Sequence, residues 1–238
     1  MMRRVALAVL MAALAVQPVV AMQDDAAIAK LETDCLRDSD QDLADRMIEA
    51  CTALIDGERG DSSDIAEYLY RRANAYEEIQ EYAAALADYD AAIALRPDHD
   101  DTWLNRGLTR RRSGDIEGAL ADYAEVLRIN PANPLARTNR AFIAIDLERY
   151  DEAIRDLKPQ AEGDPDDWAA NFNLGAAYAY NRQYDAARAA FEIAFANGPA
   201  WLTDEYASRM SVAGLGPSSL APKDLAEGMT ACIRAGDC

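Results

Sequence analysis

The sequence has 238 residues, and half of them are apolar, which is enough to bury a sizeable core. It carries 42 acidic and 24 basic residues, so its formal net charge is −18 at pH 7. A field of this sign repels nucleic acids and anionic lipid surfaces, and the composition therefore argues against both as partners.

The first 21 residues predict a secretory signal peptide. A pair of arginines forms a short positive region, an unbroken apolar run spans 5–16, and Pro18 ends it before small residues that suit cleavage after Ala21. Cleavage leaves 22 basic and 42 acidic residues, a net charge of −20. The run is shorter than the roughly 20 residues of a membrane span, and an uncleaved anchor is the alternative. We therefore expect a periplasmic or secreted protein.

A repeat of 34 residues fills the centre of the chain. Its period is set by four prolines: Pro97, Pro131, Pro165 and Pro199. The corresponding units are 66–99, 100–133, 134–167 and 168–201. Each unit predicts two antiparallel helices, with the proline ending the second one. A single helix pair cannot bury its apolar face, so successive units are expected to stack.

Three positions of each unit carry a constant type of side chain. The eighth is small (Ala73, Gly107, Ala141, Gly175), the twentieth is alanine (Ala85, Ala119, Ala153, Ala187), and the twenty-fourth is large (Tyr89, Tyr123, Leu157, Phe191). Small residues allow two helices to approach closely, and a large one fills the space beside them. This pattern resembles the tetratricopeptide repeat (TPR) family. The departures from the family pattern are Arg110, Arg137, Asn171 and Gln160.

The resemblance implies an all-α fold, a right-handed α-solenoid of helix pairs with a C-terminal capping helix and a short helical tail. Residues 22–65 are expected to form a degenerate N-terminal helix pair and loop. Within that pair Cys35 takes the small eighth position and Cys51 the large one. Because these positions face each other, a Cys35–Cys51 disulfide is expected, and its loop is worth about 3 kcal/mol in the chain-entropy model.

Residues 202–238 are expected to complete the domain. A capping helix is predicted over 200–212, a linker over 214–222 and a last helix over 223–235. A second disulfide, Cys232–Cys238, would tie down the end of the chain, since an even number of cysteines after a signal peptide favours paired thiols. Other pairings or free thiols are the alternative.

Arginine and aspartate vary together between the units. Three units have arginine at the seventh position and aspartate at the twenty-third: Arg72 with Asp88, Arg106 with Asp122, and Arg140 with Asp156. The fourth unit has Leu174 and Ala190, so both charges are lost together. We predict structural ion pairs within a unit or between neighbours. A basic stripe that binds a ligand is the alternative.

Three further arginines, 110–112, end the first helix of the second unit, where the helix dipole favours cations. They form either a solvated, salt-bridged helix end or a basic spot at the edge of the binding groove. In the second case Arg111 and Arg112 would suit an acidic peptide or a C-terminal carboxylate.

The resemblance places the first helices of the units on a concave, peptide-binding face. The sixth position there predicts a ladder of Asn105, Asn139 and Asn173, whose amides can hold an extended peptide backbone. The alternative is that these amides bridge neighbouring helices. Three more residues are expected to line the groove: Tyr70, Asn74 and Phe172. The two-carboxylate clamp of chaperone-tail-binding members is not expected, because Tyr70, Leu135 and Asn139 stand where it needs basic residues.

No motif predicts catalysis, a metal site or a cofactor. The single histidine, His99, lies in an acidic turn, and no nucleophile elbow or phosphate loop occurs. The cysteines lack the C-x-x-C spacing of disulfide exchange. The sequence therefore favours a non-enzymatic module that binds a peptide segment or partner protein in its groove, as an adaptor or assembly factor of the cell envelope. The alternative is a structural subunit of an envelope complex that uses its convex face or its termini.

Overall fold

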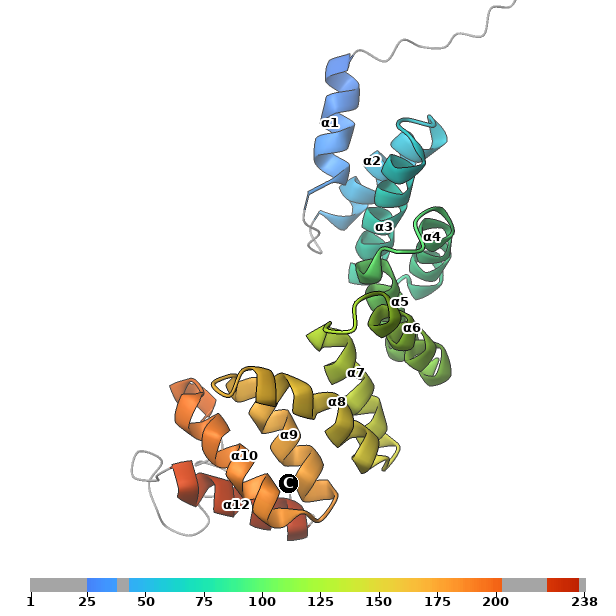
Figure 1. The fold of residues 1–238 in the computed structure, drawn as a ribbon. Helices are drawn as coiled ribbons and strands as arrows, with labels where there is room; N and C mark the ends of the chain where they lie inside the picture. The colour runs from blue at the N-terminus through green and yellow to red at the C-terminus, as the bar shows by residue number, and fades with distance from the viewer. Residues whose placement is uncertain (1–24, 38–42, 203–221, 236–238) are drawn as a thin grey trace, which may run out of the picture.

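The computed structural model describes residues 25–37, 43–202 and 222–235, which form helices joined by short turns (Figure 1). In chain order the helices are α1 (Asp25–Cys35), α2 (Ala44–Asp56), α3 (Ser62–Glu78), α4 (Tyr82–Leu95), α5 (Asp100–Ser113), α6 (Ile116–Ile129), α7 (Pro134–Asp146), α8 (Tyr150–Gly163), α9 (Trp168–Tyr180), α10 (Tyr184–Asn197) and α12 (Pro222–Ala235). The described residues contain no strand, and the predicted all-α solenoid is confirmed. The predicted signal peptide lies outside them.

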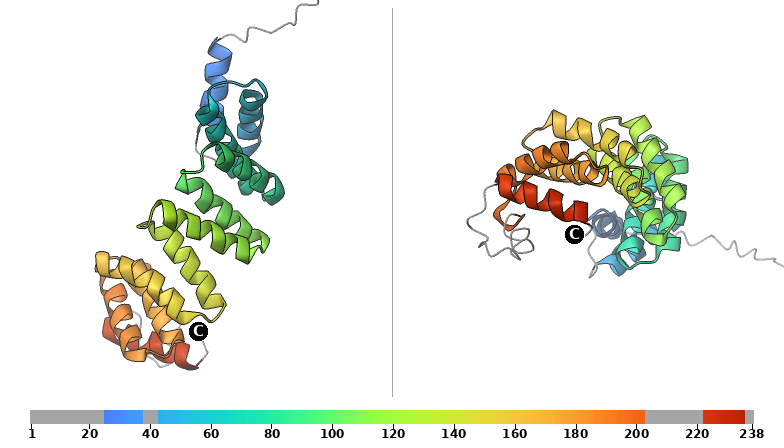
Figure 2. Two further views of the ribbon diagram at one scale, coloured as in Figure 1. Left: turned by 45° about the vertical axis from the view of Figure 1, so that its right-hand side comes forward. Right: turned by 90° about the horizontal axis from the view of Figure 1, so that it is seen from below.

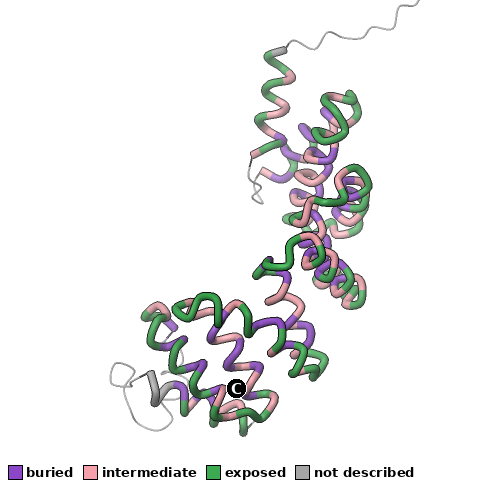
Figure 3. The backbone as a smooth tube through the Cα atoms, viewed as in Figure 1, coloured by how far each residue is buried: buried purple, intermediate pink, exposed green. Residues whose placement is uncertain are grey.

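Each predicted unit holds one antiparallel helix pair, from α3 and α4 to α9 and α10. The small eighth position is where the two helices touch. A Cβ added at Gly107 would lie 2.8 Å from the ring of Tyr123, and one at Gly175 would lie 2.7 Å from the ring of Phe191. Buried residues recur along the facing sides of the helices, whereas the turns are mostly exposed (Figure 3).

The units stack into a continuous curved array (Figure 2). First helices of successive units contact one another, in the pairs α3–α5, α5–α7 and α7–α9, whereas the second helices of successive units are farther apart. The array therefore curves with its first helices on the inner side. This inner face is the surface on which the sequence places the peptide-binding residues.

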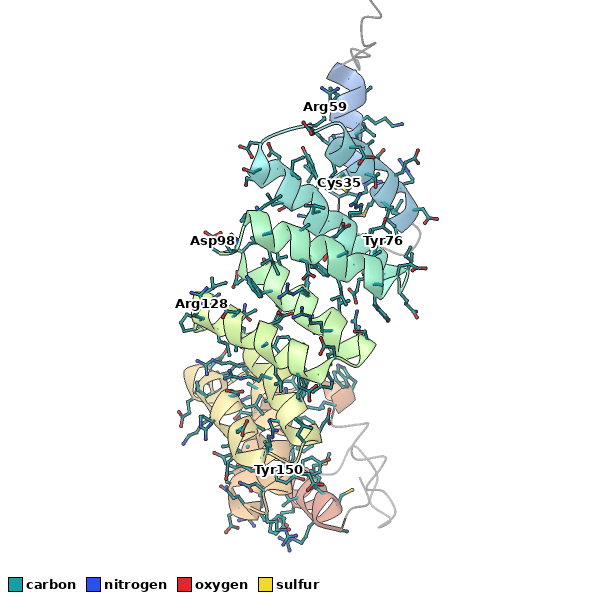
Figure 4. The ribbon with its side chains drawn as sticks, turned by 90° about the vertical axis from the view of Figure 1, so that its right-hand side faces the viewer. Cys35, Arg59, Tyr76, Asp98, Arg128 and Tyr150 are labelled. Atoms are coloured by element: carbon teal, nitrogen blue, oxygen red, sulfur yellow. A yellow bond between two sulfur atoms is a disulfide. The ribbon has the colours of Figure 1, made fainter. Side chains whose placement is uncertain are left out.

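The N-terminal helices α1 and α2 pack against each other. A disulfide joins Cys35 of α1 to Cys51 of α2 across a Cα–Cα distance of 5.0 Å (Figure 4). Both cysteines are fully buried beside Leu54 and Tyr68, in a small cluster of their own. The covalent link thus lies at the centre of a terminal unit whose apolar core is small.

The C-terminal end is closed by α12, which packs against α10 and α9. Ala226 and Met229 of this helix cover the rings of Phe191 and Phe195. In these contacts α12 stands where the first helix of a further unit would lie. The helix predicted over 200–212 lies, beyond Leu202, outside the described residues. Cys232 is disulfide-bonded, and its predicted partner Cys238 is likewise outside them.

The turn inside each unit requires one residue with a left-handed backbone. It is the fifteenth residue every time, and only the second unit uses glycine: Gln80, Gly114, Glu148 and Arg182. Side chains other than glycine are strained in this region by about 1–2 kcal/mol. The three other units tolerate that strain at an exposed turn.

We predict that Gly114→Ala lowers the free energy of unfolding by about 1 kcal/mol, measured by urea denaturation. The φ of Gly114 is 90°, and an added Cβ would meet no atom within 4 Å, so the loss reflects backbone conformation alone. Gly163→Ala is the matched control, because its added Cβ also meets nothing but its φ is not positive. If both variants are equally destabilised, this account of the turn is wrong.

Candidate functional site

Bidentate ion pairs join the two helices of each of the first three units. Arg72 donates to Asp88 at 2.7 and 2.8 Å, Arg106 to Asp122 at 3.0 and 2.6 Å, and Arg140 to Asp156 at 2.7 and 2.6 Å. The predicted partners thus meet within a unit. For Arg72 and Arg140 the hydrogen bonds to aspartate are the largest influence, and they raise the pKa of each guanidinium. These arginines are part of the scaffold.

The second unit carries the most extensive of these networks. Asp122 is only 1% exposed and accepts from both Arg106 and Arg110, the latter at 2.9 Å. Arg106 also donates to Asp90 of the preceding unit at 2.6 Å and lies over the ring of Trp103 at 4.6 Å. Arg110, which stands where the family usually has an aromatic residue, therefore supplies a second cation to a buried carboxylate.

Arg137 and Asn171, which depart from the family pattern at the fourth position, make equivalent hydrogen bonds, and Trp103 makes a third. Trp103 donates from Nε1 to the carbonyl of Pro97 at 2.9 Å. Arg137 makes the equivalent bond to Pro131 at 2.7 Å, and Asn171 to Pro165 at 3.1 Å. Three chemically different side chains thus offer an N–H group to the proline carbonyl that precedes the helix. The first unit has the apolar Leu69 at this position, so the hydrogen bond is a feature of the other three units.

Gln160 connects neighbouring units. Its Oε1 accepts from Thr138 at 3.4 Å, and its Nε2 donates to Asp167 at 2.9 Å. Asp167 in turn caps α9 by accepting from the backbone N–H of Ala170 at 3.0 Å. A polar side chain at this usually apolar position therefore ties α7 and α8 to the start of α9.

Three of the predicted binding residues come together on the inner face. Asn105 donates from Nδ2 to the hydroxyl of Tyr70 at 3.0 Å and to Oδ1 of Asn74 at 3.1 Å. The same Oδ1 accepts from the hydroxyl of Tyr89 at 2.6 Å. Asn105 therefore bridges α3 and α5. Bridging neighbouring helices is the alternative role that the sequence left open for the asparagines. The donor groups of Asn105 are already used within the protein.

The other two asparagines of the ladder differ from Asn105. Asn139 donates from Nδ2 to the carbonyl of Leu135, one turn earlier in α7, at 2.9 Å. Its Oδ1 accepts from Arg111 at 3.5 Å. Asn173 is half-buried and makes no hydrogen bond with the described residues. The three amides therefore do not form a uniform row, and contact with a peptide remains a prediction for each.

Phe172 is part of the C-terminal core. Its ring centroid lies 5.4 Å from that of Phe191 and 6.2 Å from that of Phe195. This ring cluster is the one that α12 covers. Phe172 therefore packs against α10 and α12, because α12 adds a helix beyond the last unit, and its contact with a peptide stays a prediction.

The arginines at the end of α5 border a hollow of about 480 Å³ on the inner face, lined by Leu108, Arg111, Arg112 and Asn139. Arg112 forms an ion pair with Glu77 of α3. Arg111 is half-buried and forms no ion pair with the described residues; its hydrogen bond is the one to Asn139. Arg112 thus fits the predicted salt-bridged helix end. Arg111 fits the predicted basic spot, because it borders the hollow without an ion pair among the described residues.

Tyr123 has a polar group that its expected role in packing does not use. Its side chain is fully buried, and its hydroxyl has no hydrogen-bond partner among the described residues. In the first unit the equivalent Tyr89 hydroxyl donates to Asn74 and interacts with Thr109. The positions equivalent to Asn74 and Thr109 in the next unit are Leu108 and Ile143, which offer no acceptor. The change from Asn74 and Thr109 to Leu108 and Ile143 was visible in the sequence, and it indicates that the Tyr123 hydroxyl lacks these two partners.

Among the described residues, no three or more His, Cys, Asp or Glu side chains are grouped to hold a metal ion. Within the same residues, every helix is too short or too polar to span a bilayer.

A family model described as tetratricopeptide repeat matches residues 70–134 and 139–200. Over 120 residues the chain is 26% identical to protein O-mannosyl-transferase TMTC1 of Mus musculus, a match that covers 50% of this chain and 12% of that protein. The chain thus spans a small part of the length of this relative.

Solved structures share the arrangement of helices. A tetratricopeptide repeat protein from Parabacteroides merdae has a TM-score of 0.59 and 23% identity, covering 83% of this chain and 75% of its own. YrrB, described as having an unusual peptide-binding site, has a TM-score of 0.58 and 20% identity, with 79% and 94% coverage. MamA has a TM-score of 0.59 and 16% identity, with 66% and 89% coverage. At these identities the likeness shows the fold.

We predict that Asp122→Ala alone is more destabilising than Asp122→Ala combined with Arg106→Leu. The single change leaves a buried guanidinium without its main partner, a loss of about 3–5 kcal/mol. The double variant approaches the Leu174 and Ala190 pair that the fourth unit already accommodates. Free energies of unfolding from urea titrations compare the two, and a double variant that is the less stable contradicts the pairing.

We also predict opposite effects for two tyrosine-to-phenylalanine changes. Tyr89→Phe removes a 2.6 Å hydrogen bond and should lower the free energy of unfolding by about 1 kcal/mol. Tyr123→Phe removes a buried hydroxyl that has no partner among the described residues, so stability should stay the same or rise by about 1 kcal/mol. Thermal and urea unfolding of both variants test this, and an equal loss in each would show that the Tyr123 hydroxyl is bonded.

Proposed function

Because the chain belongs to the tetratricopeptide repeat family, we propose that it is a protein-interaction module that holds a peptide segment or partner protein along its inner face. We further propose that it acts in the cell envelope, as an adaptor or assembly factor without catalytic activity. The signal-like N-terminus and the buried Cys35–Cys51 disulfide support an oxidising compartment.

The observation that carries this proposal is Leu135. Its large apolar side chain is 58% exposed, although it lies on α7, a first helix of the array. The Asn139 side chain, one turn later, donates to the Leu135 carbonyl and accepts from Arg111. An exposed apolar side chain among such groups is what a peptide-binding groove requires, because apolar burial gives affinity and polar contacts give register. The peptide-binding site named for the similar YrrB structure adds support from the fold.

The alternative is a structural subunit that uses its convex face. Ile193, on the second helix α10, is 38% exposed beside a shallow hollow of about 480 Å³ on that side. Pro165, Ala189 and Ala196 also line this hollow. A partner that packs helix against helix would bury these side chains.

A matched pair of variants distinguishes the two. Leu135→Glu and Ile193→Glu place the same charge at exposed apolar positions on opposite faces. Each tagged protein is crosslinked in the native cell envelope and its partners are identified by mass spectrometry, after circular dichroism shows equal helicity.

We expect the parent and Ile193→Glu to capture the same partner and Leu135→Glu to lose at least tenfold, since burying an unpaired charge costs more than 1–2 kcal/mol. Loss of the partner in Ile193→Glu alone would instead establish the convex face as the interface.

A further inference from the structure

We infer that a hollow at the edge of the third unit is a subsite for one aromatic side chain of the partner, with tryptophan preferred. The inference rests on the proposed function and adds the residue that anchors the partner. The hollow has a volume of about 310 Å³ and lies where the turn between α6 and α7 meets the C-terminal half of α8. Its lining consists of Pro131, Ala132, Pro134, Arg137, Pro159 and Gln160.

The second unit shows which kind of side chain fills the equivalent space. At its fourth position Trp103 donates from Nε1 to the proline carbonyl ahead of α5 and packs against the cluster that contains Val126. The third unit has Arg137 at the fourth position and Gln160 at the position of Val126. Arg137 reaches the equivalent carbonyl, that of Pro131, at 2.7 Å. Its side chain is narrower than an indole, so space beside it stays open.

The ion pair of the third unit is also less covered than that of the second. The guanidinium of Arg106 lies over the ring of Trp103 at 4.6 Å and bonds to Asp90, and the Arg106 side chain is 10% exposed. The equivalent Arg140 side chain is 33% exposed, and Ala124 stands at the position of Asp90. The third unit thus lacks an aromatic group with which its neighbour shields a buried ion pair.

The lining favours an aromatic ring over other side chains. Three proline rings and the methyl group of Ala132 give it apolar surfaces. Among the described residues that line the hollow, Arg137 is the charged one, and it forms no ion pair within the described part of the chain. A guanidinium attracts the face of an aromatic ring and repels lysine and arginine side chains.

The same surroundings disfavour a carboxylate. It would be drawn to Arg137, but it would lose hydration against the prolines, and the net charge of −18 repels it. Indole forms the strongest cation–π contact of the natural aromatic rings. Its N–H group can also share the carbonyl of Pro131, because a carbonyl oxygen has two lone pairs and Arg137 uses one. We therefore expect tryptophan to bind best.

Leu135 connects the hollow with the proposed inner-face site. It follows Pro134 in the first turn of α7 and is 58% exposed. A segment that packs on Leu135 can therefore place a neighbouring side chain in the hollow. A volume of about 310 Å³ is at the lower end of the roughly 300–1,000 Å³ of ligand pockets, so the hollow takes one side chain.

Three peptides of one frame test the inference by NMR titration of the full-length chain. They are N-acetyl-Ser-Ala-X-Ala-Ser-amide with tryptophan, leucine or glutamate at X. With the tryptophan peptide we expect saturable shifts of the amides in the turn between α6 and α7 and of the Arg137 Nε–H. The leucine peptide should bind at least about fivefold more weakly, because it lacks the cation–π contact, and the glutamate peptide more weakly still.

Arg137→Trp is the main variant, because it gives the third unit the side chain that the second unit already holds at this position. Its own indole should fill the hollow and weaken binding of the tryptophan peptide at least about tenfold, while urea unfolding shows no loss of stability. Arg149→Trp is the matched control. It makes the same substitution at the exposed start of α8, at the other end of the helix from Pro159, and should bind the peptide as the parent does.

A second variant reaches the hollow from the opposite side. Ala132→Leu enlarges an exposed turn residue of the lining, where a larger side chain leaves the helix packing unchanged. It should weaken binding of the tryptophan peptide severalfold, and it decides the matter if Arg137→Trp does not fold.

The inference is overturned if the parent binds the tryptophan and leucine peptides equally, or binds the glutamate peptide more tightly. It is also overturned if no peptide causes a shift at millimolar concentration, or if folded Arg137→Trp binds as the parent does. Each of these results leaves the proposed function intact, since that is decided separately by the capture of partners with the Leu135 and Ile193 variants.

Discussion

The close approach of two helices at the eighth residue of each unit is the constraint on which the other features depend. With glycine or alanine there, the second helix can lay a large side chain directly across the first, as Tyr123 does over Gly107. The crossing fixes the distance between the helices and brings the seventh and twenty-third positions within hydrogen-bond range. The Arg–Asp pairs are thus possible because the backbones are already close. They stabilise the crossing because each guanidinium meets its carboxylate in bidentate geometry.

The same constraint lets the units differ in chemistry while sharing a backbone. The large side chain at the twenty-fourth position is fully buried in all four units, but the groups it meets vary. Tyr89 meets Asn74, Tyr123 meets apolar neighbours, and in the last unit Phe191 has no polar group to satisfy. A repeat array can therefore change the polarity around one buried side chain and keep the same helix packing. Among these four positions, the hydroxyl without a partner in the described residues is that of Tyr123, in the second unit.

Much of the fold could be predicted because it depends on periodic properties. The proline spacing gives the units, and the joint loss of arginine and aspartate in the fourth unit gives the ion pairs. The overlay of Cys35 and Cys51 on facing positions gives the disulfide. The role of the fourth position was not predictable by residue type, because Trp103, Arg137 and Asn171 share only an N–H donor. The packing of Phe172 against α12 could not be predicted, because α12 adds a layer that the 34-residue period does not contain. The lack of a partner for the Tyr123 hydroxyl could be predicted only by comparing its neighbours Leu108 and Ile143 with the equivalent residues around Tyr89.

The place of α12 also determines how such molecules can associate. An array of identical stacking units has an exposed apolar surface at each end. If the end of one molecule packed on the opposite end of another, the chains would form an open filament. Here α12 covers Phe191 and Phe195, the apolar side chains on which a next unit would be seated. A second copy could stack at this end as a further unit only by displacing α12. The helix thereby limits the inner face, at this end, to the units of a single chain.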